Sequence, residues 1–151
     1  MIAKGSVAPS FTLAADSGES VSLSDFQGRR VVLYFYPKDD TPGCTVQACD
    51  FRDRTTAFRE VGTIVLGVSP DSVASHGRFR DRFQLDFPLL VDEDHVACEA
   101  YGVWKERTVD GRPHWGVERS TFLIDETGVV SSVWRKVEPK GHAEEIEQHL
   151  K

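Results

Sequence analysis

Residues 31–36, with the sequence VVLYFY, form an apolar run that has no polar alternation, and this run constrains the fold more than any other stretch. A strand with one solvated face alternates polar and apolar residues, whereas a strand covered on both faces is continuously β-branched and aromatic. Pro37 ends the run. The sequence therefore predicts a central strand in a sheet that is covered on both sides.

The segments after this strand alternate between helical and buried-strand patterns. Thr41 is expected as the N-cap and Pro42 as the first residue of a helix, whose apolar or small residues fall at 44, 48, 51, 55 and 58. Further strands are predicted at residues 63–68, 87–91, 119–124 and 129–137, and further helices at 72–83, weakened by Gly77, at 95–101 and at 141–150. This order predicts an α/β fold with a mainly parallel or mixed central sheet flanked by helices.

The N-terminal segment has a different pattern. Short alternating stretches surround the turn residues 16–18, Asp-Ser-Gly, which predicts a β-hairpin rather than a core element. The sequence contains no internal repeat, low-complexity tract or long linker, and 151 residues suit a single hydrophobic core. We therefore expect one domain over residues 1–151.

Composition narrows the choice of partner and compartment. The chain is 40% hydrophobic and 28% charged, and no apolar run approaches the ~20 residues that span a bilayer, so no membrane insertion is expected. The net charge of −6, without a block of Lys and Arg, argues against nucleic acid as the main partner. The start of the chain, MIAKGSVAPSF, lacks the apolar core of an export signal, so a cytoplasmic location is expected. Three cysteines in such a chain indicate reactive or metal-binding thiols rather than a disulfide scaffold.

Cys44 is the first candidate for reactive chemistry. It falls in the first turn of the predicted helix, where free backbone N–H groups and the helix dipole stabilise a thiolate. The loop at residues 37–43 contains two prolines and a glycine and can bring backbone amides close to whatever the sulfur attacks. The alternative is that Cys44 is a small buried apolar residue.

Cys49 lies five positions after Cys44 on the same predicted helix. Helix geometry separates the two Cα atoms by about 8–9 Å, and a disulfide needs less than about 7 Å, so the pair can join only if the first turns unwind. A sulfenic acid formed on Cys44 would need such a nearby thiol before it is oxidised further. Two alternatives stay open: Cys49 is structural, or both thiols bind zinc together with a distant histidine.

The segment YFYPKDDTPGCTVQAC closely resembles the active-site segment of the peroxiredoxins, specifically the bacterioferritin comigratory protein or peroxiredoxin Q group. The resemblance extends to LLVDEDHVACEAYGVW and RSTFLIDETGVV. It implies a thioredoxin-like fold, with Cys44 as the peroxidatic cysteine and Cys49 as the resolving cysteine. It also implies that Pro37, Thr41 and Arg119 complete the site. The Arg119 guanidinium would stabilise the thiolate and hold a peroxide oxygen, the Thr41 hydroxyl would exchange a hydrogen bond with the peroxide, and Pro37 would limit water.

The resulting hypothesis is a thiol-dependent peroxidase that reduces hydrogen peroxide and organic hydroperoxides in antioxidant defence. A Cys44 sulfenic acid is resolved by Cys49 as an intramolecular disulfide, which thioredoxin or a similar dithiol protein then reduces. A monomer is the expected working form, and no metal, haem, flavin or other cofactor is implied. Two rivals are a disulfide oxidoreductase that works without peroxide and a non-catalytic redox switch.

Other candidates are assigned structural roles. Cys98 is expected to be buried and inert, with a resolving role as the alternative. The acidic run at residues 92–94 is expected to be a solvated connection between strand and helix, and residues 105–116 a loop that shapes access to the site.

Overall fold

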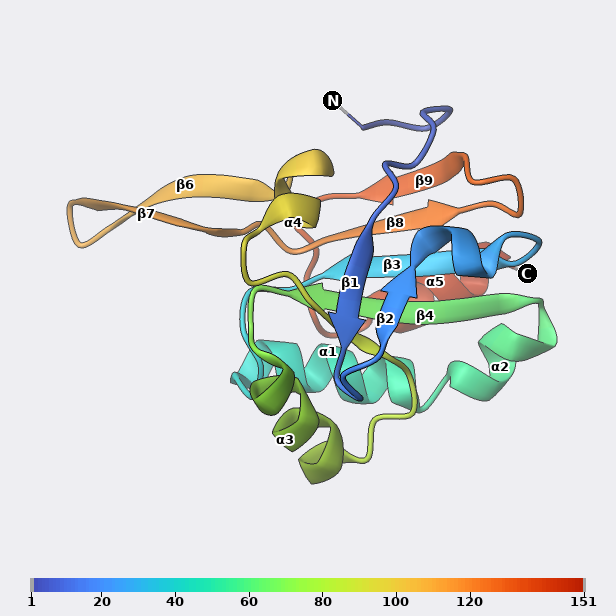
Figure 1. Cartoon of the computed structure of the whole chain (residues 1–151), viewed down its shortest axis with the longest axis horizontal. Coiled ribbons are helices and arrows are strands. Elements are labelled where there is room, and N and C mark those ends of the chain that lie inside the picture. Colours follow the sequence, from blue (N-terminus) through green and yellow to red (C-terminus); the bar gives the residue numbers. More distant parts are fainter. Residues whose placement is uncertain (1, 151) are drawn as a thin grey trace.

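The computed structural model describes residues 2–150. In this range the main sheet contains β1 (Thr12–Ala15), β2 (Ser20–Ser22), β3 (Arg30–Phe35), β4 (Thr63–Ser69), β5 (Leu89–Val91), β8 (Ser120–Ile124) and β9 (Val130–Trp134). The strand order is β2-β1-β5-β4-β3-β8-β9, which places β3 in the interior of the sheet (Figure 1). β3 is parallel to β4 and antiparallel to β8, and β4 is parallel to β5, so the sheet is mixed, as predicted.

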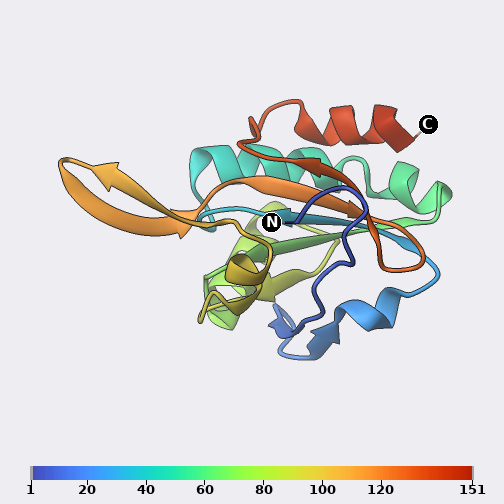
Figure 2. The same cartoon turned by 90° about the horizontal axis from the view of Figure 1, so that it is seen from above.

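Helices cover both faces of this sheet. They are α1 (Pro42–Arg52), α2 (Thr55–Glu60), α3 (Val73–Phe83), α4 (Val96–Ala100), α5 (His142–Leu150) and a short 3-10 helix, η1 (Leu23–Phe26). The core on one face joins residues of α1, α2, α3 and α5, and the core on the other joins α4 with the N-terminal segment and η1. In Figure 2, α1 and α5 lie on one side of the sheet and α4 on the other.

The side chains of β3 explain why its sequence does not alternate. Val32, Tyr34 and, directly after the strand, Tyr36 enter one core, whereas Val31, Leu33 and Phe35 enter the other, and all six are buried. Neither face of the strand is exposed to solvent, and the predicted central strand is confirmed.

Several boundaries differ from the predictions. The helix expected to continue to residue 58 ends at Arg52, and α2 follows as a separate helix. Gly77 lies inside α3 without interrupting it. The N-terminal hairpin is present, but β1 also pairs with β5 and so extends the main sheet.

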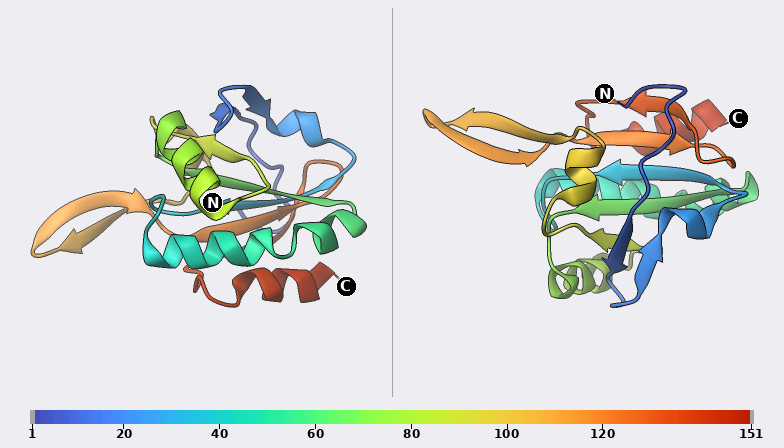
Figure 3. Two further views of the ribbon diagram at one scale, coloured as in Figure 1. Left: turned by 90° about the horizontal axis from the view of Figure 1, so that it is seen from below. Right: turned by 45° about the horizontal axis from the view of Figure 1, so that its top comes forward.

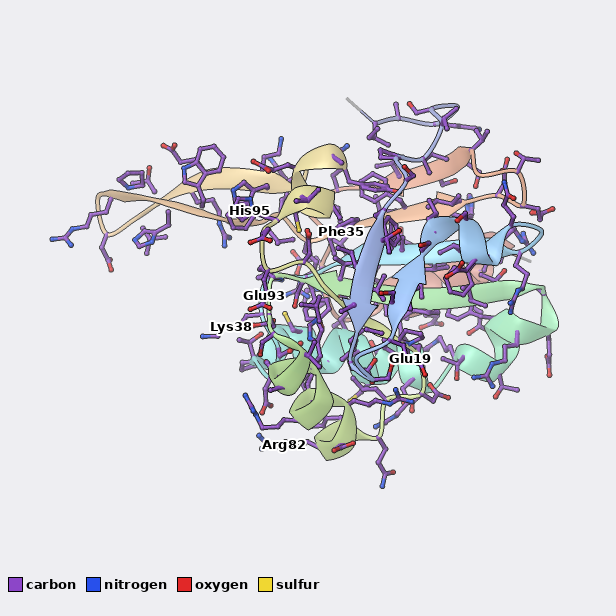
Figure 4. The ribbon with its side chains drawn as sticks, viewed as in Figure 1. Glu19, Phe35, Lys38, Arg82, Glu93 and His95 are labelled. Carbon is purple, nitrogen blue, oxygen red and sulfur yellow. The ribbon has the colours of Figure 1, made fainter. Side chains whose placement is uncertain are left out.

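The expected loop at residues 105–116 is instead a β-ribbon. Strands β6 (Trp104–Val109) and β7 (Arg112–Val117) pair along their length and project from the body of the molecule (Figures 1 and 3). Asp110 and Gly111 connect them with φ values of +53° and +76°, the conformation of a tight two-residue hairpin turn. At its base, Trp104 stacks on His95, with ring centroids 4.1 Å apart. Figure 4 labels His95 beside this ribbon. None of the helices in residues 2–150 combines the length and the apolar character needed to cross a membrane.

Candidate active site

Cys44 occupies the first turn of α1, directly after the loop that leaves the carboxyl end of β3. Thr41 is the N-cap in an extended conformation, and Pro42 is the first helical residue, whose fixed φ suits that position. The Cys44 side chain is 1% exposed, and its Sγ accepts a hydrogen bond from Nη2 of Arg119 at 3.3 Å. The sulfur is therefore held between a helix N-terminus and a guanidinium, both of which stabilise negative charge.

Sheet topology brings Arg119 to this position. Arg119 immediately precedes β8, and the first residue of β8, Ser120, pairs with Phe35 at the end of antiparallel β3. The start of β8 and the loop after β3 therefore share one edge of the sheet, although 75 residues separate Cys44 from Arg119.

Gln47 is a site residue that the sequence predictions missed. It lies three positions after Cys44 on α1 and is fully buried, and its Oε1 accepts a hydrogen bond from Nη1 of Arg119 at 2.5 Å. One guanidinium thus bridges Cys44 and Gln47 on a single face of α1, as residues at i and i+3 allow. Among the described residues, the Gln47 Nε2 group has no hydrogen-bond partner, so the contact with Arg119 is the side-chain hydrogen bond that offsets the burial of this amide.

Gly43 leaves room for the guanidinium. A Cβ atom at this position would lie 3.3 Å from Nη2 of Arg119 and 3.4 Å from Cγ of Pro139. A side chain here would displace either Arg119 or the segment between β9 and α5 that carries Pro139.

The Thr41 hydroxyl donates to the Lys38 carbonyl at 2.9 Å and makes no capping hydrogen bond to α1. The expected N-cap position is therefore confirmed, but the hydroxyl stabilises the loop instead of the helix end. Pro37 is half-buried and follows β3 closely, two residues before the buried Asp39. Both residues thus border the segment that carries Cys44.

Cys49 lies on the same helix as Cys44 and is half-buried. The three cysteines all fall in the described range and are free thiols. The intact α1 holds Cys44 and Cys49 too far apart for a disulfide. Cys98 lies on α4, in the core on the opposite face of the sheet. Burial, and then Asp92, raise the pKa of its thiol far above the usual range, so it stays a neutral thiol.

The expectation for Asp92 was wrong. Its side chain is buried, and its carboxylate oxygens accept hydrogen bonds from the backbone N–H groups of Ala97 and Cys98, at 3.1 and 2.8 Å. Asp92 therefore satisfies free donors at the start of α4, which a solvated loop residue would not do.

An aromatic cluster underlies the site. Tyr34 of β3 stacks on Phe51 of α1 and on Tyr36, with ring centroids 4.5 and 5.4 Å apart. Its hydroxyl has no hydrogen-bond partner among residues 2–150. Burial raises the pKa of Tyr34 well above its usual value, and the nearby Cys44 adds to this, so the phenol remains neutral.

Comparison with known proteins gives concordant results. The AhpC/TSA family matches residues 4–133. The peroxiredoxin Bcp of Bacillus subtilis is 51% identical over 147 residues, which cover 97% of this chain and 94% of that protein. The structure of a cysteine-to-serine mutant of Xylella fastidiosa PrxQ superposes with a TM-score of 0.92 at 38% identity, over 99% of this chain and 94% of that one. A Xanthomonas campestris bacterioferritin comigratory protein, described for its alkyl peroxide reduction activity, gives a TM-score of 0.89 at 41% identity, over 93% and 89% of the two chains. These similarities confirm the predicted thioredoxin-like fold.

Proposed function

The chain belongs to the AhpC/TSA family and, within it, to the Bcp or PrxQ peroxiredoxins, which are thiol peroxidases, and we propose that its Cys44 reduces hydrogen peroxide and organic hydroperoxides. The observation that carries the proposal is the Arg119 guanidinium, 3.3 Å from a buried sulfur at a helix N-terminus. A fixed cation and free N–H groups favour the thiolate, and they also stabilise the charge that develops on the peroxide oxygens.

In the first step the Cys44 thiolate attacks one peroxide oxygen. An S–O bond forms as the O–O bond breaks, and the departing oxygen takes a proton and leaves as water or an alcohol. Arg119 orients the peroxide with its fixed donors. The Thr41 hydroxyl exchanges its Lys38 partner for a peroxide oxygen, and Pro37 limits access of water to the pocket.

In the second step Cys49 attacks the Cys44 sulfenic acid, a disulfide forms and water leaves. The first turns of α1 must open for this, because both cysteines lie on the intact helix. A protein dithiol such as thioredoxin then supplies two electrons by thiol–disulfide exchange. Because both thiols lie on one chain, a monomer suffices, and the need for free thiols suits the cytoplasm.

Two experiments test this assignment. Cys44→Ser should abolish steady-state peroxide consumption with thioredoxin, and Cys98→Ser serves as the matched control that retains it. Peptide mapping after one equivalent of peroxide should find Cys44 joined to Cys49. Turnover by the Cys44→Ser variant would refute the peroxidatic assignment, and a Cys44–Cys98 disulfide would transfer the resolving role. Consumption that stops after one equivalent despite excess thioredoxin would favour a redox switch.

A second comparison addresses the substrate. Rate constants for hydrogen peroxide and for a bulky organic hydroperoxide should both exceed that of a free thiol by orders of magnitude. If only hydrogen peroxide reacts rapidly, the organic hydroperoxide part of the proposal is wrong.

A further inference from the structure

The loop between β3 and α1 is attached to α3 through a buried carboxylate. Asp39 is 7% exposed, and its Oδ1 accepts a hydrogen bond from the Tyr36 hydroxyl at 2.6 Å. Its Oδ2 accepts from the Ser75 hydroxyl at 2.8 Å and lies 2.6 Å from Nδ1 of His76. Figure 4 labels Lys38, the loop residue that precedes Asp39. The segment that leads to Cys44 is thus joined to a helix outside the reacting one.

The contact between His76 and Asp39 is an ion pair. The side chain is fully buried, and its Nε2 lies 2.8 Å from the Leu90 carbonyl oxygen, which can only accept a hydrogen bond. Its Nδ1 faces the Asp39 carboxylate, which is also an acceptor, so both ring nitrogens carry hydrogen and the ring is positively charged. Burial opposes this charge, but the hydrogen bond and the negative charge of Asp39 outweigh it, and the pKa of His76 is raised.

Two further contacts hold the same loop. The Asp39 N–H donates to Oδ2 of Asp71 at 2.8 Å, and the same oxygen accepts from the Ser69 hydroxyl at 2.6 Å. Asp40, with a φ of +58°, pairs with Arg82 of α3 on the surface, where such a pair adds little. Asp39, Asp71 and His76 are close enough together to bind a metal, but the hydrogen bonds named above already occupy their facing atoms.

We propose that the His76–Asp39 ion pair is a positioning device that keeps residues 37–40 fixed while α1 unwinds, so that opening begins at Thr41 and Cys44 returns to Arg119 after each cycle. This inference rests on the proposed function, because it concerns the balance between the folded α1 that reacts with peroxide and the open α1 that forms the disulfide. A fixed loop favours the folded form. A free loop favours the open form, in which Arg119 no longer contacts the sulfur.

Asp39→Asn tests the proposal, because it removes the negative partner while keeping the size of the side chain. We expect the rate constant for Cys44 oxidation to fall only in proportion to the loss of the folded form, which stays small while the folded form predominates. We expect the fraction of Cys44 over-oxidised to sulfinic acid per turnover to fall more, roughly threefold or more, because the open form in which Cys49 attacks is more populated. Stopped-flow fluorescence measures the first quantity, and intact mass after high peroxide measures the second.

Asp16→Asn is the matched control. Asp16 is also a buried carboxylate paired with α3, since it accepts from Arg80 at 2.5 Å and from the Leu89 N–H at 3.0 Å, but it lies away from the Cys44 loop. This variant should lose thermal stability without changing the ratio of sulfinic acid to disulfide. An unchanged ratio in Asp39→Asn, or an equal change in both variants, would overturn the proposal. Failure of the proposed function is a separate result, because wild-type protein would then show no peroxide turnover or no Cys44–Cys49 disulfide.

The pH dependence of the sulfinic fraction distinguishes an effect of the His76–Asp39 ion pair from an effect of packing alone. The titratable groups that face His76 are Asp39 and Asp71 from the two loops and Tyr36 directly after β3, and burial keeps Tyr36 neutral by raising its pKa. A raised pKa means that the pair is present at lower pH and is lost as pH rises through that pKa. The wild-type sulfinic fraction should therefore fall with rising pH. In the His76→Asn variant, an amide N–H lies near the position of Nδ1 and can donate to Asp39 at every pH. The sulfinic fraction of this variant should therefore change less with pH than that of the wild type. Parallel profiles for wild type and His76→Asn between about pH 6 and 9 would overturn the proposal.

Discussion

Replacement of Arg119 by methionine removes the charge and the donors of the guanidinium while keeping most of the length of the side chain. The lost interaction with the sulfur is one charge-assisted hydrogen bond at 3.3 Å. Such bonds contribute about 1.5–3 kcal/mol, which corresponds to a fall of about 10- to 150-fold in the rate constant for peroxide if the contact is kept in the transition state. The same change leaves Gln47 Oε1 buried without its donor, which costs about 1–3 kcal/mol of folding stability.

The two effects can be measured apart. Stopped-flow oxidation of Cys44 gives the rate constant, and thermal or urea unfolding gives the stability. Adding Gln47→Leu to the Arg119→Met variant should recover stability, because the unpaired amide is gone, while the rate stays low. Arg135→Met is the control, since Arg135 donates to backbone carbonyls of Gly102 and Ile2 away from the site. A rate constant within threefold of wild type in a folded Arg119→Met variant would show that the guanidinium does not assist the attack of Cys44 on peroxide.

Three neighbours of the Cys44 site give further tests. Gly43→Ala should slow Cys44 oxidation by about tenfold with little loss of stability, because its Cβ crowds Nη2 of Arg119; an unchanged stopped-flow rate would show that the guanidinium is free to shift. Tyr34→Phe should be neutral or stabilising by up to about 1 kcal/mol in urea unfolding, because its hydroxyl has no partner among the described residues, and a clear loss would reveal one. His142 has a pKa lowered by burial, so its contribution to stability is present above the unfolded-state value and is lost as pH falls. His142→Gln should therefore reduce the loss of thermal stability between about pH 7 and 5, and an equal loss in both proteins would contradict this.

Features encoded by neighbouring residues were predictable from the sequence. The apolar run at residues 31–36, which forms most of β3, and the Thr41-Pro42 start of α1 are local signals, and each appears in the structure where it was expected. The fold class followed from these signals because buried strands alternating with helices can pair in few ways. The first turn of α1, with Cys44 in it, was likewise determined by local sequence.

Features that depend on distant partners were not predictable in this way. No sequence signal marked Gln47 as a site residue, because its partner Arg119 is 72 residues away. Asp92 belongs to an acidic run that suits solvent, yet the start of α4 buries it. The β6–β7 ribbon was missed because its strands are mostly exposed and show no clear apolar alternation, although Asp110-Gly111 is a strong hairpin turn.

Under the proposed function, both participating thiols lie on the 11-residue α1, so temperature also affects the balance between disulfide and sulfinic acid. Opening about eight residues of native structure absorbs heat, at roughly 0.2 kcal/mol per residue near 25 °C, so the open population should rise by about a quarter between about 15 and 37 °C. Attack on peroxide needs no such opening. A cold cell would therefore lose more of this enzyme to irreversible sulfinic acid at a given peroxide dose than a warm one, a difference that mass spectrometry of the protein recovered at the two temperatures would measure.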